Sequence, residues 1–268
     1  MGELFGEADA AAWIAVPVDD DDKYSRGVAG FVTGSARYPG AAVLGVEAAL
    51  RTGVGMVRYL GPGRATRLVL QRRPEAVTAE GRVQAWVLGS GWDTARSDEL
   101  TRMLLEPVFE GTAPTVLDAG ALDLWPRIGA PRVLTPHAGE LARLIEVERD
   151  EVLADREAAL RRAVELTGAT VLLKGAETLV LSPGGEVLRV RNATPWLATA
   201  GAGDALAGIL GALVATHADA PDLAPVAAAA AWIHGEAARR ASDGGPLVIL
   251  DLCTAIPGVV RGLATMNA

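Results

Sequence analysis

Short β-rich runs alternate with helical stretches along most of this chain, and this alternation is the feature that most restricts its fold. The β-rich runs are apolar and are typical of strands that are buried on both faces: Gly30–Thr33, Met56–Leu60, Ala85–Leu88, Thr115–Leu117, Arg132–Leu134 and Thr170–Leu173. The helical stretches between them are Ala41–Arg51, Ser97–Phe109, Ala138–Glu146 and Glu151–Leu166. Strands alternating with helices predict a three-layer α/β fold, with a mostly parallel central sheet and helices on both faces.

The pattern changes after residue 177. Two β-like runs, Thr178–Leu181 and Glu186–Val190, flank a Ser-Pro-Gly-Gly sequence and predict an antiparallel hairpin. Helices are then expected at Ala202–Thr216, Leu223–Ser242 and Thr254–Ala264. No repeat or low-complexity linker interrupts the chain, and we therefore expect one domain over residues 1–268. Sheets of this kind bind ligands beyond the carboxyl ends of their strands, so functional residues are expected in the loops that follow strands.

Charge and composition exclude several kinds of partner. A formal net charge of −8 opposes binding to duplex DNA or to an anionic membrane surface. Cys253 is the only cysteine, which precludes a disulfide within one chain and fits the reducing cytoplasm. The first residues lack the layout of a signal peptide, and the apolar stretches are too short to span a membrane. We therefore expect a cytoplasmic protein with no nucleic-acid or membrane partner.

The most informative motif is Leu-Ala-Thr-Ala-Gly-Ala-Gly-Asp-Ala-Leu-Ala-Gly, residues 197–208. Small residues allow a backbone loop to approach a ligand closely, and the start of the next helix offers free N–H groups, which predicts an anion hole at Gly201, Ala202 and Gly203. Asp204 lies in or just before the first helical turn. Alternatively, Asp204 is an ordinary N-cap and the glycines form a tight turn. The run of small residues favours a site for an anionic ligand at the start of this helix.

Two further segments follow expected strands. Lys174 comes directly after one and is followed by Gly-Ala-Glu-Thr, so its ammonium group could reach a phosphate, or it could be a solvated lysine that opens the hairpin. His137 follows another strand within Thr-Pro-His-Ala-Gly-Glu, and is either a site residue or an ordinary loop histidine. His217 and His234 are interpreted as structural. The three histidines are too dispersed for a metal triad, and no protein ligand for a metal can be assigned.

Loops after the first, third and fourth expected strands are also rich in small residues. The segment Thr33–Ala42, with Lys23–Gly27 before it, could line an anionic site or be a generic loop. Gly89-Ser-Gly-Trp and Asp118-Ala-Gly-Ala follow two other strands. Trp92 and Trp196 could stack on a flat ring, although packing in the core is the alternative for both.

Taken together and in this order, these segments resemble the ADP-dependent NAD(P)H-hydrate dehydratases of the ribokinase-like superfamily. The resemblance covers about residues 23–265 and leaves residues 1–22 as an N-terminal extension. The corresponding segments are Lys23–Gly27 with Gly34–Leu44, Gly89–Gly91, Val116–Leu122, Leu134–Leu144, Val171–Thr178 and Leu197–Gly211. The resemblance implies a ribokinase-like fold with a nine- or ten-stranded sheet, and assembly into a homotetramer.

The resemblance also implies a repair reaction. The S epimer of hydrated NADH or NADPH (NADHX or NADPHX) loses its hydroxyl group and regenerates NAD(P)H, while the co-substrate ADP becomes AMP and phosphate, with Mg²⁺ as cofactor. Asp204 corresponds to the catalytic base. By similarity, the hydrated cofactor contacts Ala42, Gly91, His137 and Asp204. The nucleotide contacts Lys174, Gly175, Ala176, Glu177, Thr178 and Gly203.

Three segments depart from the family pattern. Lys-Tyr-Ser-Arg-Gly at 23–27 replaces His-Lys-Gly, Gly-Ser-Gly at 89–91 replaces Gly-Pro-Gly, and Ala-Gly-Ala-Gly-Asp at 200–204 replaces Gly-Gly-Thr-Gly-Asp. The last change removes one hydroxyl donor but keeps the main-chain donors and the acid. Two alternatives stay open: a ribokinase-like kinase that acts on the hydroxymethyl group of a vitamin precursor, and a non-catalytic nucleotide-binding relative.

Overall fold

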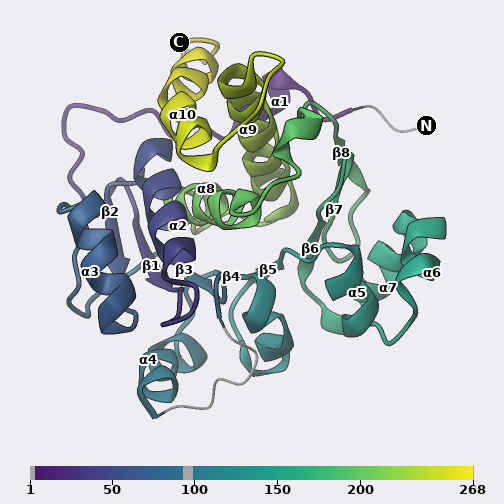
Figure 1. Cartoon of the computed structure of the whole chain (residues 1–268), viewed down its shortest axis with the longest axis horizontal. Helices are drawn as coiled ribbons and strands as arrows, with labels where there is room; N and C mark the ends of the chain where they lie inside the picture. The colour runs from purple at the N-terminus through teal and green to yellow at the C-terminus, as the bar shows by residue number, and fades with distance from the viewer. Residues whose placement is uncertain (1–3, 93–98, 268) are drawn as a thin grey trace.

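Figure 1 shows the computed structural model, which describes residues 4–92 and 99–267. Its central sheet has eight strands in the order β2-β1-β3-β4-β5-β6-β7-β8. The strands are β1 Val28–Val32, β2 Met56–Tyr59, β3 Ala85–Leu88, β4 Thr115–Leu117, β5 Arg132–Leu134, β6 Thr170–Leu173, β7 Thr178–Leu181 and β8 Leu188–Val190. All pairings from β2 to β6 are parallel, whereas β6-β7 and β7-β8 are antiparallel. The predicted mostly parallel sheet and the predicted antiparallel hairpin, formed by β7 and β8, are therefore confirmed.

Helices cover both faces of this sheet (Figure 1). They are α1 Glu7–Ala11, α2 Pro39–Thr52, α3 Gly63–Arg72, α4 Glu99–Glu110, α5 Ala138–Leu144, α6 Arg149–Ala154, α7 Arg156–Thr167, α8 Ala202–Thr216, α9 Ala224–Ser242 and α10 Ile249–Ala264, with short 3₁₀ helices at Ala119–Arg127 (η1) and Pro195–Leu197 (η2). Because successive side chains of a strand point to opposite faces, Val87 and Val116 lie in the core beneath α8, while Leu88 and Leu117 lie in the second core.

The structure differs from the sequence predictions in several elements. The described residues form eight strands, so the nine or ten implied by the family resemblance is wrong. The single helix expected at Glu151–Leu166 is two helices, because Asp155 has a non-helical backbone and caps α7 by accepting the N–H of Ala158 at 2.9 Å. Helix α3 was not predicted, although its two buried side chains, Ala65 and Val69, are spaced four residues apart, as expected on one face of a helix. Helix α10 begins before the expected Thr254, and Ser97 lies outside the described residues.

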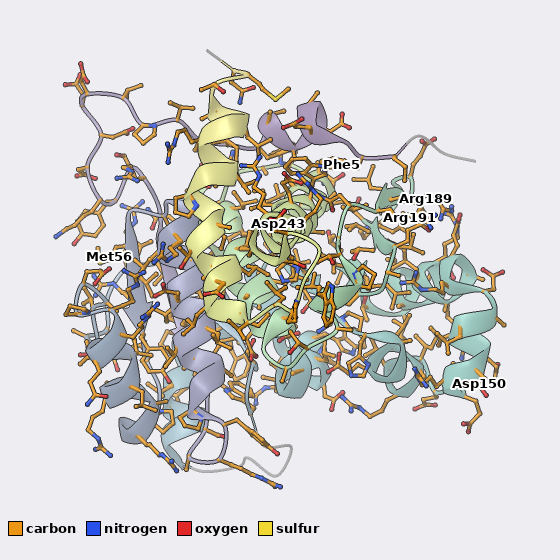
Figure 2. The ribbon with its side chains drawn as sticks, turned by 45° about the horizontal axis from the view of Figure 1, so that its top comes forward. Phe5, Met56, Asp150, Arg189, Arg191 and Asp243 are labelled. Carbon is orange, nitrogen blue, oxygen red and sulfur yellow. The ribbon has the colours of Figure 1, made fainter. Side chains whose placement is uncertain are left out.

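The N-terminal segment covers the edge strand β8. Leu4 forms an isolated parallel bridge with Arg189, and the N–H of Phe5 donates to the carbonyl of Arg189 at 2.9 Å (Figure 2). Arg189 is held in turn by Glu157 and by Glu177, the latter at 3.1 Å. Covering an edge in this way protects its unpaired backbone groups from pairing with another chain.

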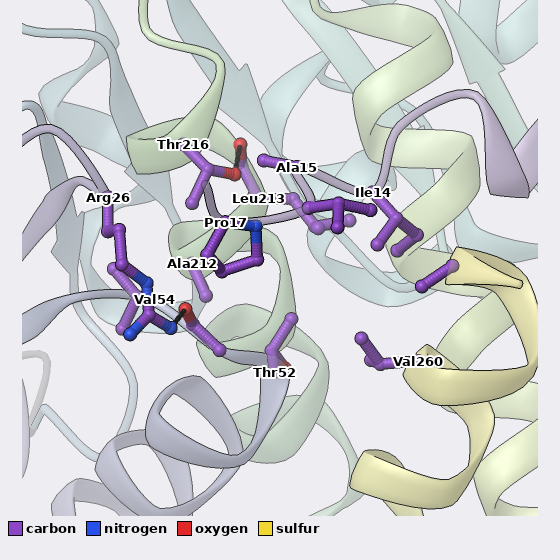
Figure 3. A pocket seen from close by; sticks show the side chains of 13 residues that line it. Ile14, Ala15, Pro17, Arg26, Thr52, Val54, Ala212, Leu213, Thr216 and Val260 are labelled. Atoms are coloured by element: carbon purple, nitrogen blue, oxygen red, sulfur yellow. Dashed lines mark hydrogen bonds between the residues drawn. The ribbon is translucent and has the colours of Figure 1, made fainter. Parts of the chain in front are cut away.

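A small cavity of about 200 Å³ lies at the carboxyl end of α8, away from the start of that helix. Apolar side chains such as Ile14, Leu213 and Val260 form most of its wall (Figure 3). Its charged lining residue, Arg26, donates to the carbonyl of Gly53 at 2.8 Å. No helix within the described residues is long and apolar enough to cross a membrane.

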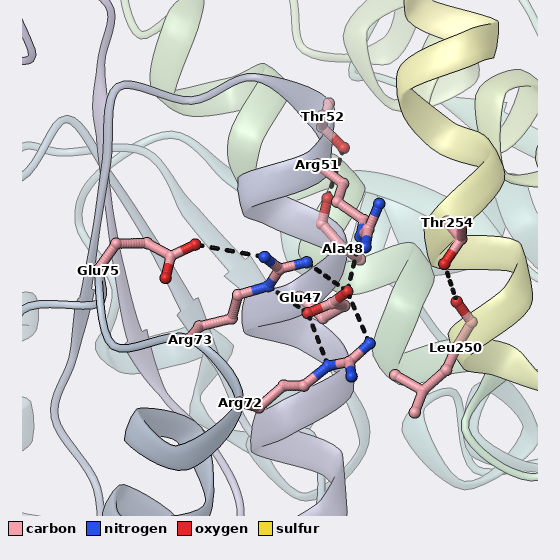
Figure 4. A network of polar contacts seen from close by, with 9 residues as sticks. All are labelled: Glu47, Ala48, Arg51, Thr52, Arg72, Arg73, Glu75, Leu250 and Thr254. Atoms are coloured by element: carbon pink, nitrogen blue, oxygen red, sulfur yellow. Dashed lines mark hydrogen bonds and ion pairs between the residues drawn. The ribbon is translucent and has the colours of Figure 1, made fainter.

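Helix α2 contains a buried acid, Glu47, whose side chain has no exposed surface. Figure 4 shows that three arginines converge on it. Arg51 lies 2.6 Å and Arg72 3.2 Å from Glu47 Oε1, and Arg73 bonds to both carboxylate oxygens. Burial alone raises the pKa of Glu47, but the hydrogen bonds from the arginines outweigh it and lower the pKa from 4.5 to about 2. This network ties α2 to the end of α3.

We expect Glu47→Gln to destabilise the fold by about 3 kcal/mol at pH 7, because three arginines then share a site without their carboxylate. A depressed pKa stabilises the fold above pH 4.5, and this stabilisation is lost as pH falls toward 2. Urea unfolding should therefore show a difference from wild type that shrinks between pH 5 and pH 3. Glu75→Gln is the control, because Glu75 is half exposed and contacts Arg73 at 3.4 Å. Equal losses in both variants contradict the prediction.

Candidate active site

Because parallel strands end at a common edge, the loops after β1, β3, β4, β5 and β6 lie next to one another there. Hydrogen bonds connect them. The N–H of Gly34 donates to the carbonyl of Ser90 at 2.7 Å, and the Ser90 hydroxyl donates to Asp118 at 2.8 Å. Thr135 also donates its hydroxyl to Asp118, at 2.8 Å, and Lys174 donates to the same oxygen at 2.9 Å. Asp118 thus joins the loops that follow four different strands.

Lys174 lies between two carboxylates. Its Nζ atom is 2.9 Å from Asp118 Oδ1 and 3.6 Å from Glu140 Oε2, and its side chain is 20% exposed. Burial alone lowers the pKa of this lysine, but the charges of Asp118 and Glu140 outweigh burial and raise it above its ordinary value. Lys174 therefore stays charged, and the interpretation of a solvated lysine at the start of the hairpin is wrong.

The start of α8 faces Lys174. Gly201 is the N-cap, with φ +91°, a left-handed conformation that favours glycine. A side chain added at Gly203 would begin 3.6 Å from Lys174 Nζ. The N–H of Ala202 donates to Thr199 at 3.4 Å, while those of Gly203 and Asp204 have no acceptor in the described part of the chain. Of the predicted anion hole, Gly201 and Gly203 thus keep main-chain N–H groups without an acceptor among the described residues, whereas that of Ala202 is already bonded. The N–H of Asp204 adds a further donor that is available to an anion.

Asp204 lies within the first turn of α8 and is not its cap, so the interpretation as an ordinary N-cap is wrong. Across residues 4–92 and 99–267, no hydrogen bond or ion pair reaches its carboxylate. Burial, and next the charge of Asp118, raise the pKa of Asp204 to about 7, while Lys174 acts in the opposite direction. A carboxylate that is unpaired and half-protonated near neutral pH can accept a proton from a ligand.

A cavity of about 510 Å³ opens between the segment after β6 and the start of α8. Four residues of the predicted nucleotide segment line it, namely Lys174, Gly175, Ala176 and Thr178, as do Ala202 and Gly203. Glu177 does not line it and is turned toward Arg189, at 3.1 Å. The structure therefore places most of the predicted nucleotide-binding residues around one space.

The residues expected to face the hydrated cofactor do not all lie around one space. His137 is the N-cap of α5, where its Nδ1 atom accepts the N–H groups of Gly139 and Glu140 at 3.0 and 3.1 Å, and its ring is 59% exposed. Ala42 is fully buried beneath Gly34. Gly91 has φ +71°, and a side chain there would clash with Ala41. The geometry brings Ala42 and Gly91 together around Gly34, whereas His137 lies on another loop.

Sequence reasoning missed several polar residues at this edge. Asp118 and Glu140 were not assigned a role, although each follows an expected strand, which is the available signal. His234, interpreted from the sequence as structural, lines the cavity, and burial lowers its pKa to about 4, so its ring is neutral. Asn192 also lines the cavity, and its Oδ1 atom, like His234 Nε2, is buried without a partner among the described groups.

A magnesium ion fits this site only together with phosphates. In the part of the chain that the structure describes, no three His, Cys, Asp or Glu side chains form a cluster that could hold a metal by themselves. Mg²⁺ usually retains water and binds substrate phosphates with few protein ligands, so an ion that enters with a nucleotide does not require such a cluster.

Free main-chain donors at a helix start lie close to a charged lysine and an unpaired carboxylate at the carboxyl edge of this mixed sheet. Such a site is typical of an α/β enzyme that binds an anionic ligand. The sequence model of the NAD(P)H-hydrate dehydratase family matches residues 29–255, and the chain belongs to this family. The predicted family and ribokinase-like fold are thus confirmed.

Individual relatives agree with this assignment. The chain is 44% identical over 224 residues to a bifunctional NAD(P)H-hydrate repair enzyme of Mycobacterium tuberculosis, covering 79% of this chain and 46% of the relative. It is 38% identical over 240 residues to an ADP-dependent (S)-NAD(P)H-hydrate dehydratase of Neisseria meningitidis serogroup B, covering 82% and 79%. The chain spans about half the length of the first curated relatives that it matches.

Solved structures show the same fold. An ADP/ATP-dependent NAD(P)H-hydrate dehydratase of Bacillus subtilis, co-crystallised with ATP and Mg²⁺, superposes with a TM-score of 0.86 at 25% identity, covering 97% of this chain and 98% of that one. A ribokinase-like superfamily protein of Enterococcus faecalis superposes with a TM-score of 0.84 at 21% identity, covering 97% and 95%.

We expect Asp204→Asn to stabilise the fold at pH 8 by on the order of 2 kcal/mol, because the wild-type carboxylate is charged there without a partner. Because folding raises the pKa of Asp204 from 3.8 to about 7, the free energy of unfolding of the wild type falls as pH rises through that range. The difference between variant and wild type should therefore grow from pH 4 to pH 8 in urea unfolding.

Asp251→Asn is the matched control for this stability change, since Asp251 is an exposed acid in the first turn of α10. Its loss should cost a few tenths of a kcal/mol, because an acid near a helix start is favourable. If Asp204→Asn lowers the free energy of unfolding at pH 8, as the control does, the unpaired carboxylate does not destabilise the wild-type fold and the prediction is wrong.

Proposed function

We propose that this chain catalyses the ADP-dependent dehydration of the S epimer of NADHX and NADPHX, regenerating NAD(P)H with release of AMP and phosphate. It would then be a carbon–oxygen lyase that repairs nicotinamide nucleotides. The observation that carries the proposal is the unpaired carboxylate of Asp204, which follows directly on the free main-chain donor of Gly203 in the wall of the cavity that Lys174 also lines. Membership of the family supports the choice of substrate.

The chemistry explains why a base and an anion site belong together. Hydroxide is a poor leaving group, and phosphate is a better one. Transfer of the terminal phosphoryl group of ADP to the hydroxyl of the hydrated ring leaves AMP, and elimination then releases phosphate. Asp204, with a pKa of about 7, accepts the hydroxyl proton. The N–H groups of Gly203 and Asp204 stabilise negative charge on the phosphoryl group in transit.

The positions of ADP, Mg²⁺ and the hydrated cofactor are assigned from the same arrangement of residues. We infer that ADP occupies the cavity lined by Lys174, Gly175, Ala176 and Thr178, with its phosphates toward Gly203. The ammonium group of Lys174 balances part of the phosphate charge. A magnesium ion carried by the phosphates would supply further charge neutralisation. The hydrated cofactor is assigned to the side of Asp204 that faces the loops of Gly91 and His137, with Ala42 beneath them.

The oligomeric state and the cellular location of the protein stay predictions. A homotetramer is expected from the family resemblance, and light scattering of the purified protein tests it. A cytoplasmic location is expected from the composition, and fractionation of the source cells tests it. The reaction proposed above depends on neither.

The purified chain should convert NADHX and ADP into NADH, AMP and phosphate, seen as a rise in absorbance at 340 nm. Asp204→Asn should lower kcat by about 10³-fold while leaving ADP affinity within a few fold, because the base is lost and the donors remain. A stable phosphorylated product would favour the kinase alternative. Tight ADP binding without turnover of either hydrate would favour the non-catalytic alternative and overturn the proposal.

We expect Gly203→Val to abolish ADP binding, because branched carbon atoms next to Lys174 Nζ fill the space required by the phosphates. Isothermal titration calorimetry measures this loss directly. Gly129→Val is the control: Gly129 is exposed, and a side chain there meets nothing within 4 Å. Unchanged ADP affinity in Gly203→Val contradicts the placement of the phosphates at the start of α8.

A further inference from the structure

Asp118 has no role in the reaction as described so far, yet it is the most constrained acid at this edge. It directly follows β4 and is 3% exposed. Its two carboxylate oxygens accept three hydrogen bonds, from the hydroxyls of Ser90 and Thr135 at 2.8 Å each and from Lys174 Nζ at 2.9 Å. A buried carboxylate that accepts three hydrogen bonds on its two oxygens is fixed in position.

The position of Asp118 decides where the ammonium group of Lys174 lies. Nζ contacts Asp118 and, at 3.6 Å, Glu140. Asp204 is close enough for its charge to influence Lys174, yet no ion pair joins the two residues, both of which the structure describes. A lysine and an aspartate whose charges act on each other gain free energy by pairing, and a paired Asp204 would be a poor base. Another group must therefore keep the Lys174 ammonium away from the Asp204 carboxylate.

We propose that Asp118 is a positioning residue of the reaction, which retains the Lys174 ammonium on its own side of the cavity and so leaves the Asp204 carboxylate free to accept a proton. The inference rests on the proposed function, in which Asp204 is the base. Glu140 on α5 assists by a second contact with the same ammonium group.

The charges around Asp204 agree with this arrangement. Asp118 and Lys174 are the charged groups that act on Asp204, in opposite directions. Glu140 reaches it only through Lys174, and His234 on α9 is neutral. Without the charge of Asp118, Lys174 is released toward Asp204 while the repulsion between the two acids disappears. Both changes favour the ionised form of Asp204.

The alternative is that Asp118 only ties the loops after β3, β4 and β5 together. In that case its replacement lowers stability, and activity with it, and changes the titration of Asp204 only through the lost repulsion between the two acids, whether or not Lys174 is present. Asp118→Asn separates the two roles, because the amide keeps the shape and can still bond to both hydroxyls but carries no charge.

The test follows the Asp204 carboxyl carbon by ¹³C NMR as a function of pH in the ligand-free protein, with Asp204→Asn identifying the signal. In Asp118→Asn the midpoint should fall by at least about one pH unit, as expected when an opposite charge comes within contact distance. The same substitution made in Lys174→Met removes only the repulsion between the two acids, so the fall there should be clearly smaller. Glu140→Gln is the matched control: it removes an acid from the same lysine and should leave the midpoint within about 0.3 pH units. In active protein, the acid limb of kcat/KM should move with the NMR midpoint.

An unchanged midpoint in Asp118→Asn, or an equal fall in both variants, overturns the inference. If Asp118→Asn does not fold, Lys174→Met replaces it. There the Asp204 midpoint should rise by less than about one pH unit, and a larger rise means that the lysine pairs with Asp204 directly. The NMR titration does not depend on turnover, so an inactive wild-type protein overturns the proposed function without deciding the role of Asp118.

Discussion

Parallel pairing of neighbouring strands is the constraint from which the site of this protein follows. Each parallel crossover returns the chain to the same end of the sheet, so loops far apart in sequence meet at one edge. Asp118 and Lys174 are separated by 56 residues and lie 2.9 Å apart for this reason. Helix α8 comes from outside this repeating unit and brings its N-terminus to the same edge. The order and direction of the strands, rather than any single sequence motif, therefore bring the residues of the site together.

Two buried acids show how the same fold treats carboxylates in opposite ways. Glu47 is surrounded by three arginines, and its pKa falls to about 2. Asp204 has no partner among the described residues, and its pKa rises to about 7. The first ties two helices together and stabilises the fold at neutral pH. The second costs stability at neutral pH, and the two apolar cores on either side of the sheet offset this cost.

Much of the fold could be predicted from the sequence, because buried parallel strands are short, apolar and regularly spaced. Strands β3 to β6 begin and end where expected, and the start of α8 was correctly placed at Ala202. Helix α3 was missed although its buried residues, Ala65 and Val69, have helical spacing, because a short helix that buries only two small side chains has few apolar residues to mark it. The segment after β6 that lines the cavity could be singled out from local sequence, because it follows directly on an expected strand. The link between Asp118 and Lys174 could not, since nothing local in either segment shows that the other lies opposite.

The hydrogen bonds at positions 90 and 202 show what two of the departures from the family pattern change. At position 202, alanine stands where threonine is usual, and the donors left open at this helix start are the main-chain groups of Gly203 and Asp204, which no side chain at 202 provides. At position 90, serine stands where proline is usual, and its hydroxyl donates to Asp118 at 2.8 Å. Proline has no such donor. The hydroxyl lost at one position is therefore accompanied by one gained at another, on the acid that holds Lys174 in place.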